Sequence, residues 1–506
     1  MGGSMGNKRR GHKRNKQKLQ RRIMREKLAV MIIIILLAFA GLCVRLVTIT
    51  RENQSAYQKK ILSQQRYDST TLPFKRGTIT DVNGTILAVS EKVYNVVLDC
   101  KVMLSNEKNQ APTVDALVQS FGLDKSALEK YIAEHPTSQY YVLKKKQTYE
   151  EISPFLERKE EYNAQSAASK EDIGIVDGVW FEEEYIRRYP NGTLACDVIG
   201  FTGSDNNGTY GLEEYYNDVL SGVPGREYGY LNDDSNLERT TKAAVDGYNI
   251  VTTLDANIQG IVERKLKEFN ETYQNAVRTG NGARNVGCVI QDVNNGNILA
   301  MAGYPNFDLN DPKNVENLIG TNLVDEKGNV LSDVVTPELA EELAANADSN
   351  DTLRLLNSLW RNFCIFNTYE PGSTFKVLTM AAALDCGAIG LNTSFHCTGS
   401  QQIPGRAQLL HCWRHQGHGA QQTPQALQNS CNIAFAHIAL KLGGEKFYEY
   451  VEKFGILEKT GIDLAGESKG IFFDKALVTD TDKWGTASLT SGSFGQTFKL
   501  TPLQLV

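Results

Sequence analysis

The stretch YEPGSTFKVLTMAAALD, residues 369–385, carries the most informative pattern of the chain. Pro371 and Gly372 interrupt the preceding backbone, and the following run is apolar on all sides, which predicts a helix buried in a domain core. Ser373 opens this helix and Lys376 follows three residues later, so both side chains lie on one face within reach of each other. A serine needs a neighbouring base to act as a nucleophile, and a desolvated lysine is such a base.

A second element lies downstream in NSCN, where Ser430 and Asn432 flank Cys431 in an alanine-rich helical context. Taken alone, this element fits an ordinary helix cap equally well. Ser-x-x-Lys is also frequent by chance: a second copy, Ser105 to Lys108, lies in a polar stretch that predicts a solvated loop. Only the Ser373-x-x-Lys376 and Ser430-Cys431-Asn432 elements together indicate a serine acyl-transfer site.

These elements resemble the active site of penicillin-binding proteins and serine β-lactamases, which joins Ser-x-x-Lys, Ser-x-Asn and a Lys-Thr/Ser-Gly strand. RGTITDVNGTILA, from Arg76, and RRYPNGTLACDVIGFTG, from Arg187, extend the resemblance to class B penicillin-binding proteins, although Val82 stands where a basic residue is usual. The resemblance implies an α+β multi-domain fold. Its expected parts are a single N-terminal transmembrane helix, an elongated α+β pedestal, and a transpeptidase domain with an antiparallel sheet flanked by helices.

Roles for four residues follow from the resemblance. Ser373 would be the acylated nucleophile, Lys376 its base, Ser430 a proton relay to the leaving group and Asn432 the group that orients the substrate. The third family element normally lies some tens of residues beyond the TPLQL segment, and this sequence ends at Val506. We therefore expect the transpeptidase domain to lack its C-terminal part.

Lys459-Thr460-Gly461 is a tempting substitute for the third element. We reject it because it follows Asn432 too soon and sits inside EKTGIDLAGE, which is a structural loop in the family.

The N-terminal sequence indicates how the chain is oriented across a membrane. Residues 8–27 are rich in Lys and Arg, and the uncharged run LAVMIIIILLAFAGLCV follows from residue 28. This pattern predicts one transmembrane helix with a cytoplasmic basic arm and an extracellular catalytic domain. A cleaved signal peptide, with Ala38-Phe39-Ala40 at the cleavage site, is the alternative. The expected parts are a basic arm (1–27), a membrane anchor (28–50), a pedestal or dimerisation-type domain (51–245) and a transpeptidase domain (246–506).

Two hairpins and one insertion are also predicted. The first hairpin is predicted for Arg76–Ser90, with two strands joined by a turn at Asn83-Gly84. The second is predicted for Asn285–Pro305, with two strands joined by a turn at Asn294-Asn295-Gly296. The acidic stretch 316–353 predicts a surface insertion with some helix near PELAEELAAN.

The nine cysteines form no dense framework. Most are expected to be buried small side chains, with a Cys397–Cys412 disulfide as the alternative in an extracellular domain. His411, Cys412, His415 and His418, with Cys397 nearby, also have spacings compatible with zinc. Because family members carry a similar loop without a required metal, the resemblance predicts no metal and no cofactor.

With 506 residues the chain predicts two to four domains, and a net charge of −5 gives no support for nucleic-acid binding. The resemblance implies cross-linking of D-Ala-D-Ala stem peptides of peptidoglycan through an acyl-enzyme, binding of penicillins and other β-lactams, contact with the membrane lipid bilayer, and a multi-span glycosyltransferase as partner. The alternative is a catalytically inert, membrane-anchored assembly factor of the cell-wall machinery. The acceptor amine and the choice between elongation, division and sporulation stay open.

Overall fold

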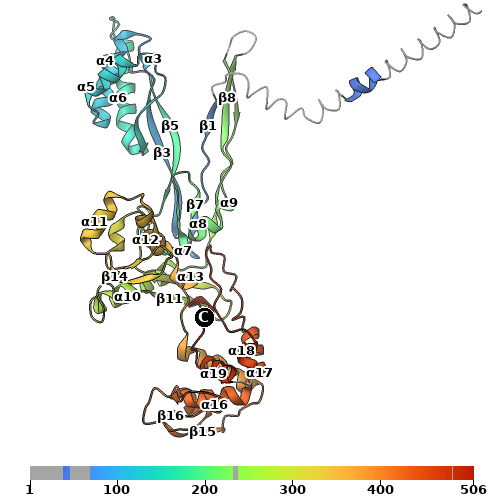
Figure 1. Cartoon of the computed structure of the whole chain (residues 1–506). Helices are drawn as coiled ribbons and strands as arrows, with labels where there is room; N and C mark the ends of the chain where they lie inside the picture. The colour runs from blue at the N-terminus through green and yellow to red at the C-terminus, as the bar shows by residue number, and fades with distance from the viewer. Residues whose placement is uncertain (1–37, 46–68, 232–236, 481–482) are drawn as a thin grey trace, which may run out of the picture. The chain divides into compact units, whose positions relative to one another are not determined.

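The computed structural model describes residues 38–45, 69–231, 237–480 and 483–506 (Figure 1). The chain divides into a smaller unit, Met1–Thr71 with Arg226–Lys242, and a larger unit, Leu72–Gly225 with Ala243–Val506. The smaller unit contains a three-stranded sheet. Its strand order is β1 (Ser69–Leu72), β8 (Gly225–Leu231) and β9 (Leu237–Lys242).

The basic arm (1–27) and most of the expected anchor (28–50) lie outside the described residues. Of the anchor, residues 38–45 are described and are helical. Within the described ranges, no helix combines the length and the apolar character needed to cross a membrane.

A long strand, β3 (Ile86–Leu98), organises the first part of the larger unit. It pairs with β2 (Ile79–Thr80) across the turn at Asn83-Gly84, which confirms the first predicted hairpin. It also pairs with β4 (Tyr141–Gln147) and, over ten residue pairs, with β5 (Val179–Arg188). Helices α4, α5 and α6 pack beside these strands (Figure 1). The other elements are α3 (Cys100–Met103), η1 (Glu107–Asn109), α4 (Gln110–Phe121), α5 (Lys125–Glu134), β4 (Tyr141–Gln147), α6 (Tyr149–Ala168), β5 (Val179–Arg188), α7 (Cys196–Ile199), β6 (Phe201–Thr202), β7 (Gly208–Thr209), α8 (Gly211–Tyr215) and α9 (Asn217–Leu220).

The second predicted hairpin is also confirmed. Strands β11 (Val286–Gln291) and β12 (Ile298–Tyr304) are antiparallel, with Val286 opposite Tyr304, and α10 (Ala256–Tyr273) packs on them. The remaining elements of this part are β10 (Ile250–Val251), η2 (Val315–Leu318), β13 (Asn322–Val324), β14 (Val330–Val334), α11 (Pro337–Ala345), α12 (Asn350–Trp360) and α13 (Phe363–Phe366).

The acidic stretch 316–353 is more than a surface insertion. Its predicted helix exists as α11, but Leu318, Val335 and Leu343 of this stretch are buried in the largest hydrophobic core of the described residues. The prediction missed this because the charged residues of the stretch mask an amphipathic pattern whose apolar face packs inward.

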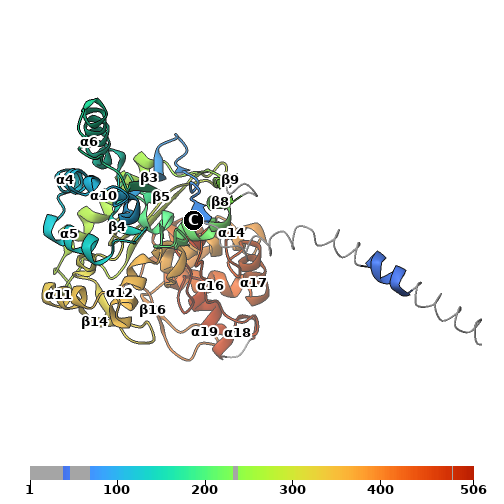
Figure 2. The ribbon, with the colours of Figure 1, turned by 90° about the horizontal axis from the view of Figure 1, so that it is seen from above.

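The predicted buried helix is α14 (Lys376–Asp385), preceded by a 3-10 turn, η3 (Gly372–Phe375). It packs against α16, which also contacts α17 and α19 (Figure 1, Figure 2). One face differs from the expectation, since Val377 is 58% exposed. The other elements here are β15 (Ser394–Cys397), β16 (Ser400–Gln401), β17 (Leu410–His411), β18 (Gly419–Gln422), α15 (Thr423–Gln428), α16 (Asn432–Leu442), α17 (Gly444–Lys453), α18 (Ala476–Thr479), α19 (Lys483–Gly492) and η4 (Leu503–Leu505).

A buried ion cluster joins distant segments of the first part. The Glu213 carboxylate accepts from Arg76 Nε at 2.7 Å and from Arg187 Nε at 2.6 Å, and all three side chains are almost completely buried. Arg76 Nη1 donates further to Asn217 Oδ1 at 2.9 Å and Ser221 Oγ at 2.7 Å. Both guanidinium groups therefore depend on this one carboxylate for charge compensation.

Replacing Glu213 with glutamine should lower the free energy of unfolding by about 3–5 kcal/mol, because two buried guanidinium groups lose their compensating charge. Lys92→Ala is the control: its ion pair with Glu183 has side chains 40% and 51% exposed, so about 1 kcal/mol or less is expected. Urea unfolding followed by circular dichroism measures both. Equal losses of unfolding free energy in the two variants would contradict the role of Glu213 in compensating the two buried arginines.

Candidate active site

Ser373 lies in the 3-10 turn that opens α14. Its side chain is exposed, and the turn is held by the Gly372 N–H, which donates to the Gly495 carbonyl at 2.8 Å. Gly495 has a φ of +78°, and a Cβ there would lie 2.0 Å from the Gly372 carbonyl oxygen. This position therefore requires glycine, and the close backbone approach fixes the start of the helix that carries Ser373.

The Lys376 amine lies at the centre of the cluster. Its Nζ lies 3.1 Å from Ser373 Oγ, 2.9 Å from Ser430 Oγ and 2.7 Å from Asn432 Oδ1, and it also donates to the Ser430 carbonyl at 2.8 Å. The residue is 1% exposed. The structure thus brings together the four residues that the sequence singled out from two separate segments.

Burial sets the protonation of this amine. It lowers the pKa of Lys376 to about 8, although the nearby Cys412 and Cys431 thiols act in the opposite direction. The rings of Phe435 and Phe494 lie 5.5 and 5.9 Å from Nζ and form part of its apolar surroundings. A neutral amine is therefore accessible near physiological pH.

Ser430 lies in a short link between two helices, after α15 ends and before α16 begins. Its φ of +50° is unusual for a residue with a side chain. Ser430 Oγ donates to Ser373 Oγ at 2.9 Å. The next residue, Cys431, is the N-cap of α16 and accepts from the Ala434 N–H. The strained backbone thus aims the hydroxyl at Ser373 while the helix start holds Asn432 in place.

A pocket of about 340 Å³ opens over these groups. Sequence reasoning did not assign four of its residues to the site: Gly372, Trp413, Phe494 and Gln496. Trp413 is 62% exposed, and its Nε1 donates to the Asn429 carbonyl at 3.0 Å. An exposed tryptophan in a loop next to the Ser-x-Asn element was the available signal for it. The lining is formed by Gly372, Ser373, Trp413, Ser430, Asn432, Phe494 and Gln496.

Lys459-Thr460-Gly461 forms a structural loop, as expected. The Thr460 N–H and hydroxyl donate to Glu467 Oε1 at 2.6 and 2.7 Å, and the Gly461 N–H donates to Glu467 Oε2 at 3.2 Å. These residues line a different pocket from Ser373.

The cysteine- and histidine-rich segment brings together a different set of side chains from the one that its sequence spacing suggested. Cys397, Cys412, His418 and Cys431 offer ligand atoms that all lie within 4.8 Å of one another. The alternative Cys397–Cys412 disulfide is absent, because both described cysteines are free. Cys431 was not considered as a ligand from the sequence, where it was interpreted only as the middle of the Ser-x-Asn element.

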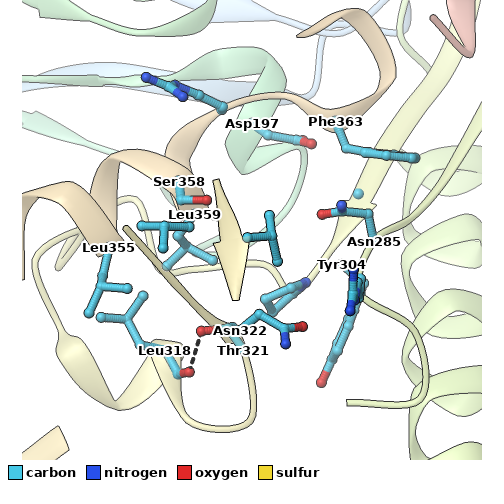
Figure 3. A pocket seen from close by; sticks show the side chains of 16 residues that line it. Asp197, Asn285, Tyr304, Leu318, Thr321, Asn322, Leu355, Ser358, Leu359 and Phe363 are labelled. Carbon is cyan, nitrogen blue, oxygen red and sulfur yellow. Dashed lines mark hydrogen bonds between the residues drawn. The ribbon is translucent and has the colours of Figure 1, made fainter. Parts of the chain in front are cut away.

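A second cavity, of about 60 Å³, is lined by Asp197 and Tyr304 among others, and by none of the four active-site residues. Burial, with the nearby Glu263 carboxylate, raises the pKa of Asp197 to about 7. Figure 3 shows its lining side chains, including the Thr321 hydroxyl, which donates to the Leu318 carbonyl at 2.6 Å. This cavity lacks a nucleophile paired with a base, so we do not assign the chemistry to it.

Comparison with known proteins places these features in a family. Residues 71–252 match the penicillin-binding protein dimerisation domain, and residues 286–506 match the penicillin-binding protein transpeptidase domain. The stage V sporulation protein D of Bacillus subtilis is 30% identical over 87% of this chain and 57% of its own length. The peptidoglycan D,D-transpeptidase MrdA of Acinetobacter baumannii is 25% identical over 86% of this chain and 59% of its own length. The chain thus spans less than two thirds of each.

The fold is also similar to solved structures. The crystal structure of penicillin-binding protein 2X from Streptococcus thermophilus aligns with a TM-score of 0.61 at 22% identity, covering 86% of this chain and 58% of that one. This agreement supports the α+β character of the two matched regions. Together, the two domain matches, the curated relatives and the fold show that the chain belongs to the class B penicillin-binding proteins.

Proposed function

We propose that this chain is a serine D,D-transpeptidase that cross-links peptidoglycan by acting on D-Ala-D-Ala stem peptides. The observation that carries the proposal is the position of the Lys376 amine, within hydrogen-bond distance of Ser373 Oγ, Ser430 Oγ and Asn432 Oδ1. Those three partners line an open pocket. The Acinetobacter relative, named a peptidoglycan D,D-transpeptidase, supports the same substrate class.

The first half-reaction is acylation of Ser373. The neutral Lys376 amine takes the proton from Ser373 Oγ as this oxygen attacks the carbonyl carbon between the two D-Ala residues. The C–N bond then breaks, and Ser430 Oγ, 2.9 Å from both Ser373 Oγ and Lys376 Nζ, passes a proton to the departing D-Ala amine. The backbone N–H of Ser373 supplies one donor for the oxyanion.

The second half-reaction resolves the acyl-enzyme. An amine of a neighbouring stem peptide attacks the Ser373 ester, its proton leaves through Ser430 and Lys376, and the Ser373–acyl bond breaks to restore the hydroxyl. Asn432 orients the peptide in both steps, because its amide borders the pocket while its Oδ1 accepts from Lys376. Penicillins and other β-lactams acylate the same hydroxyl by opening their strained amide.

The N-terminal sequence suggests where this reaction takes place. The basic arm (1–27) and the apolar run within 28–50 support a single-pass anchor with the catalytic part outside the membrane. By analogy with the family, we also propose that a multi-span glycosyltransferase is its partner.

Ser373→Ala should abolish covalent labelling by a fluorescent penicillin, because Ser373 is the exposed hydroxyl of the cluster, whereas Ser430 is partly buried and donates to Ser373 Oγ. The protein is tested as its gene encodes it, and labelling is read on a denaturing gel. Ser105→Ala is the matched control, because it removes the serine of the other, exposed Ser-x-x-Lys and should leave labelling unchanged. Wild-type protein that folds without labelling would favour an inert assembly factor instead.

The acylation rate should rise with pH through about 8. The pKa of Lys376 is lowered to about 8, so its neutral, basic form is lost as the pH falls, and the rate should drop about tenfold per pH unit below that point. Stopped-flow measurement with a chromogenic cephalosporin between pH 6 and 9.5 tests this.

Lys376→Arg should reduce the acylation rate about 100- to 10,000-fold at every pH, because a guanidinium does not deprotonate in this range. A flat pH profile for the wild type, or a residual pH dependence in this variant, would contradict the role of Lys376 as the base.

A further inference from the structure

The chain directly before Ser373 runs beside residues 495–500. Tyr369 and Leu500 exchange two backbone hydrogen bonds, each 2.9 Å long. At the other end of this pairing, the Gly495 carbonyl accepts the backbone hydrogen bond described above. Main-chain bonds therefore join the two segments at both ends, and the residues between these bonds depend on side-chain contacts.

One side chain bridges the middle of the pairing. Glu370 Oε1 accepts from the Thr497 N–H at 3.0 Å. Thr497 has a φ of +71°, a left-handed conformation that β-branched residues rarely adopt. A hydrogen bond from a backbone N–H to a carboxylate is among the stronger ones and offsets part of this strain. Glu370 thus holds Thr497 in a conformation that the residue would not adopt by itself.

Gln496 is carried by the same short loop. It is exposed and lines the pocket that also contains Ser373. Phe494 and Phe498 on either side are 3% and 2% exposed, so the loop is anchored at both ends. Within the described part of the chain, the Gln496 side-chain amide has no hydrogen-bond partner. The amide is therefore available to a ligand in the pocket.

The chemistry of this amide matches a peptide backbone. A primary amide offers donors and an acceptor, which pair with the C=O and N–H groups of an extended peptide. Asn432 brings a second primary amide to the same pocket from another segment. In the proposed reaction Ser430 passes a proton to the departing D-Ala, which places the leaving group near Ser430. Gln496 comes instead from the segment that supports Gly372, which leaves it to the acyl part of the substrate.

We propose that Gln496 is a specificity-determining residue that binds the peptide backbone on the acyl side of the bond that Ser373 attacks. Glu370 is the positioning residue that holds Gln496 there, because it fixes the Thr497 backbone. Without the carboxylate, Thr497 would relax toward a negative φ, and the displaced loop would withdraw the amide from the pocket. The substrate role of Gln496 rests on the proposed transpeptidase function, whereas the contact of Glu370 with Thr497 does not.

Two penicillins separate a substrate contact from a general loss of structure. Benzylpenicillin carries an acyl side chain joined through an amide, and 6-aminopenicillanic acid has the same reactive ring without that acyl group. In the full chain, Gln496→Leu should lower the second-order rate constant of acylation by benzylpenicillin about tenfold, as expected for one lost neutral hydrogen bond. Acylation by 6-aminopenicillanic acid should change less than about twofold. Equal losses with both compounds, or no loss with either, would overturn the role of Gln496.

Variants of Glu370 test the positioning role. Glu370→Ala should also lower the rate constant with benzylpenicillin about tenfold and spare 6-aminopenicillanic acid, whereas Glu370→Gln retains an acceptor oxygen and should stay within about threefold of the wild type. Adding Thr497→Gly to Glu370→Ala should restore most of the rate, because glycine adopts a positive φ without strain. Lys499→Ala changes an exposed side chain of the same segment and should leave both rates unchanged. A Glu370→Ala variant that acylates like the wild type, or that Thr497→Gly does not rescue, would overturn the positioning role.

Hydrogen exchange measures the contact without relying on activity. By mass spectrometry, the Thr497 amide should exchange at least about tenfold faster in Glu370→Ala than in the wild type or in Gln496→Leu. Equal exchange in all three proteins would overturn the contact. Wild-type protein that protects this amide but is not labelled by penicillin refutes the proposed function, and with it the substrate role of Gln496, and leaves the contact between Glu370 and Thr497 standing.

Discussion

The active site depends on an amino group that has been removed from water. Lys376 is 1% exposed, and its burial costs free energy unless hydrogen-bond acceptors surround the nitrogen. Ser373, Ser430 and Asn432 supply those acceptors, and apolar rings surround them. The same contacts that make burial tolerable bring the hydroxyls to the amine, so stability and reactivity share one geometry.

This arrangement requires segments far apart in sequence to be placed relative to each other with sub-ångström precision. The start of α14 is fixed by the Gly372–Gly495 backbone contact, and the start of α16 is fixed by its Cys431 cap. Helix α14 packs directly on α16. Lys376 and Asn432 begin these two helices, and Ser373 and Ser430 lie in the turns directly before them. Such support suits the proposed reaction, which depends on orientation.

Local patterns in the sequence predicted the parts of the structure that local forces determine. The i, i+3 spacing of Ser373 and Lys376 and the turns at Asn83-Gly84 and Asn294 to Gly296 depend on residues close in the chain. The Arg76–Glu213 ion pair spans 137 positions and has no local signature. The proximity of Cys431 to Cys397, Cys412 and His418 was hidden for the same reason, because these residues lie at the ends of strands whose pairing only the fold reveals. The buried residues of the acidic stretch 316–353, such as Leu343, were missed because its many polar residues obscured an apolar face.

Under the proposed function, the glycine at position 495 would limit how this protein can evolve under antibiotic selection. Any side chain there would collide with the Gly372 carbonyl and displace Ser373, so drug and natural substrate would lose the nucleophile together. Variation is far less constrained at the adjacent Gln496, which is exposed and lines the pocket. Substitutions that alter drug recognition would therefore be expected at positions such as Gln496 rather than at Gly495. An inhibitor that contacts the Gly372–Gly495 backbone would be harder to escape by mutation.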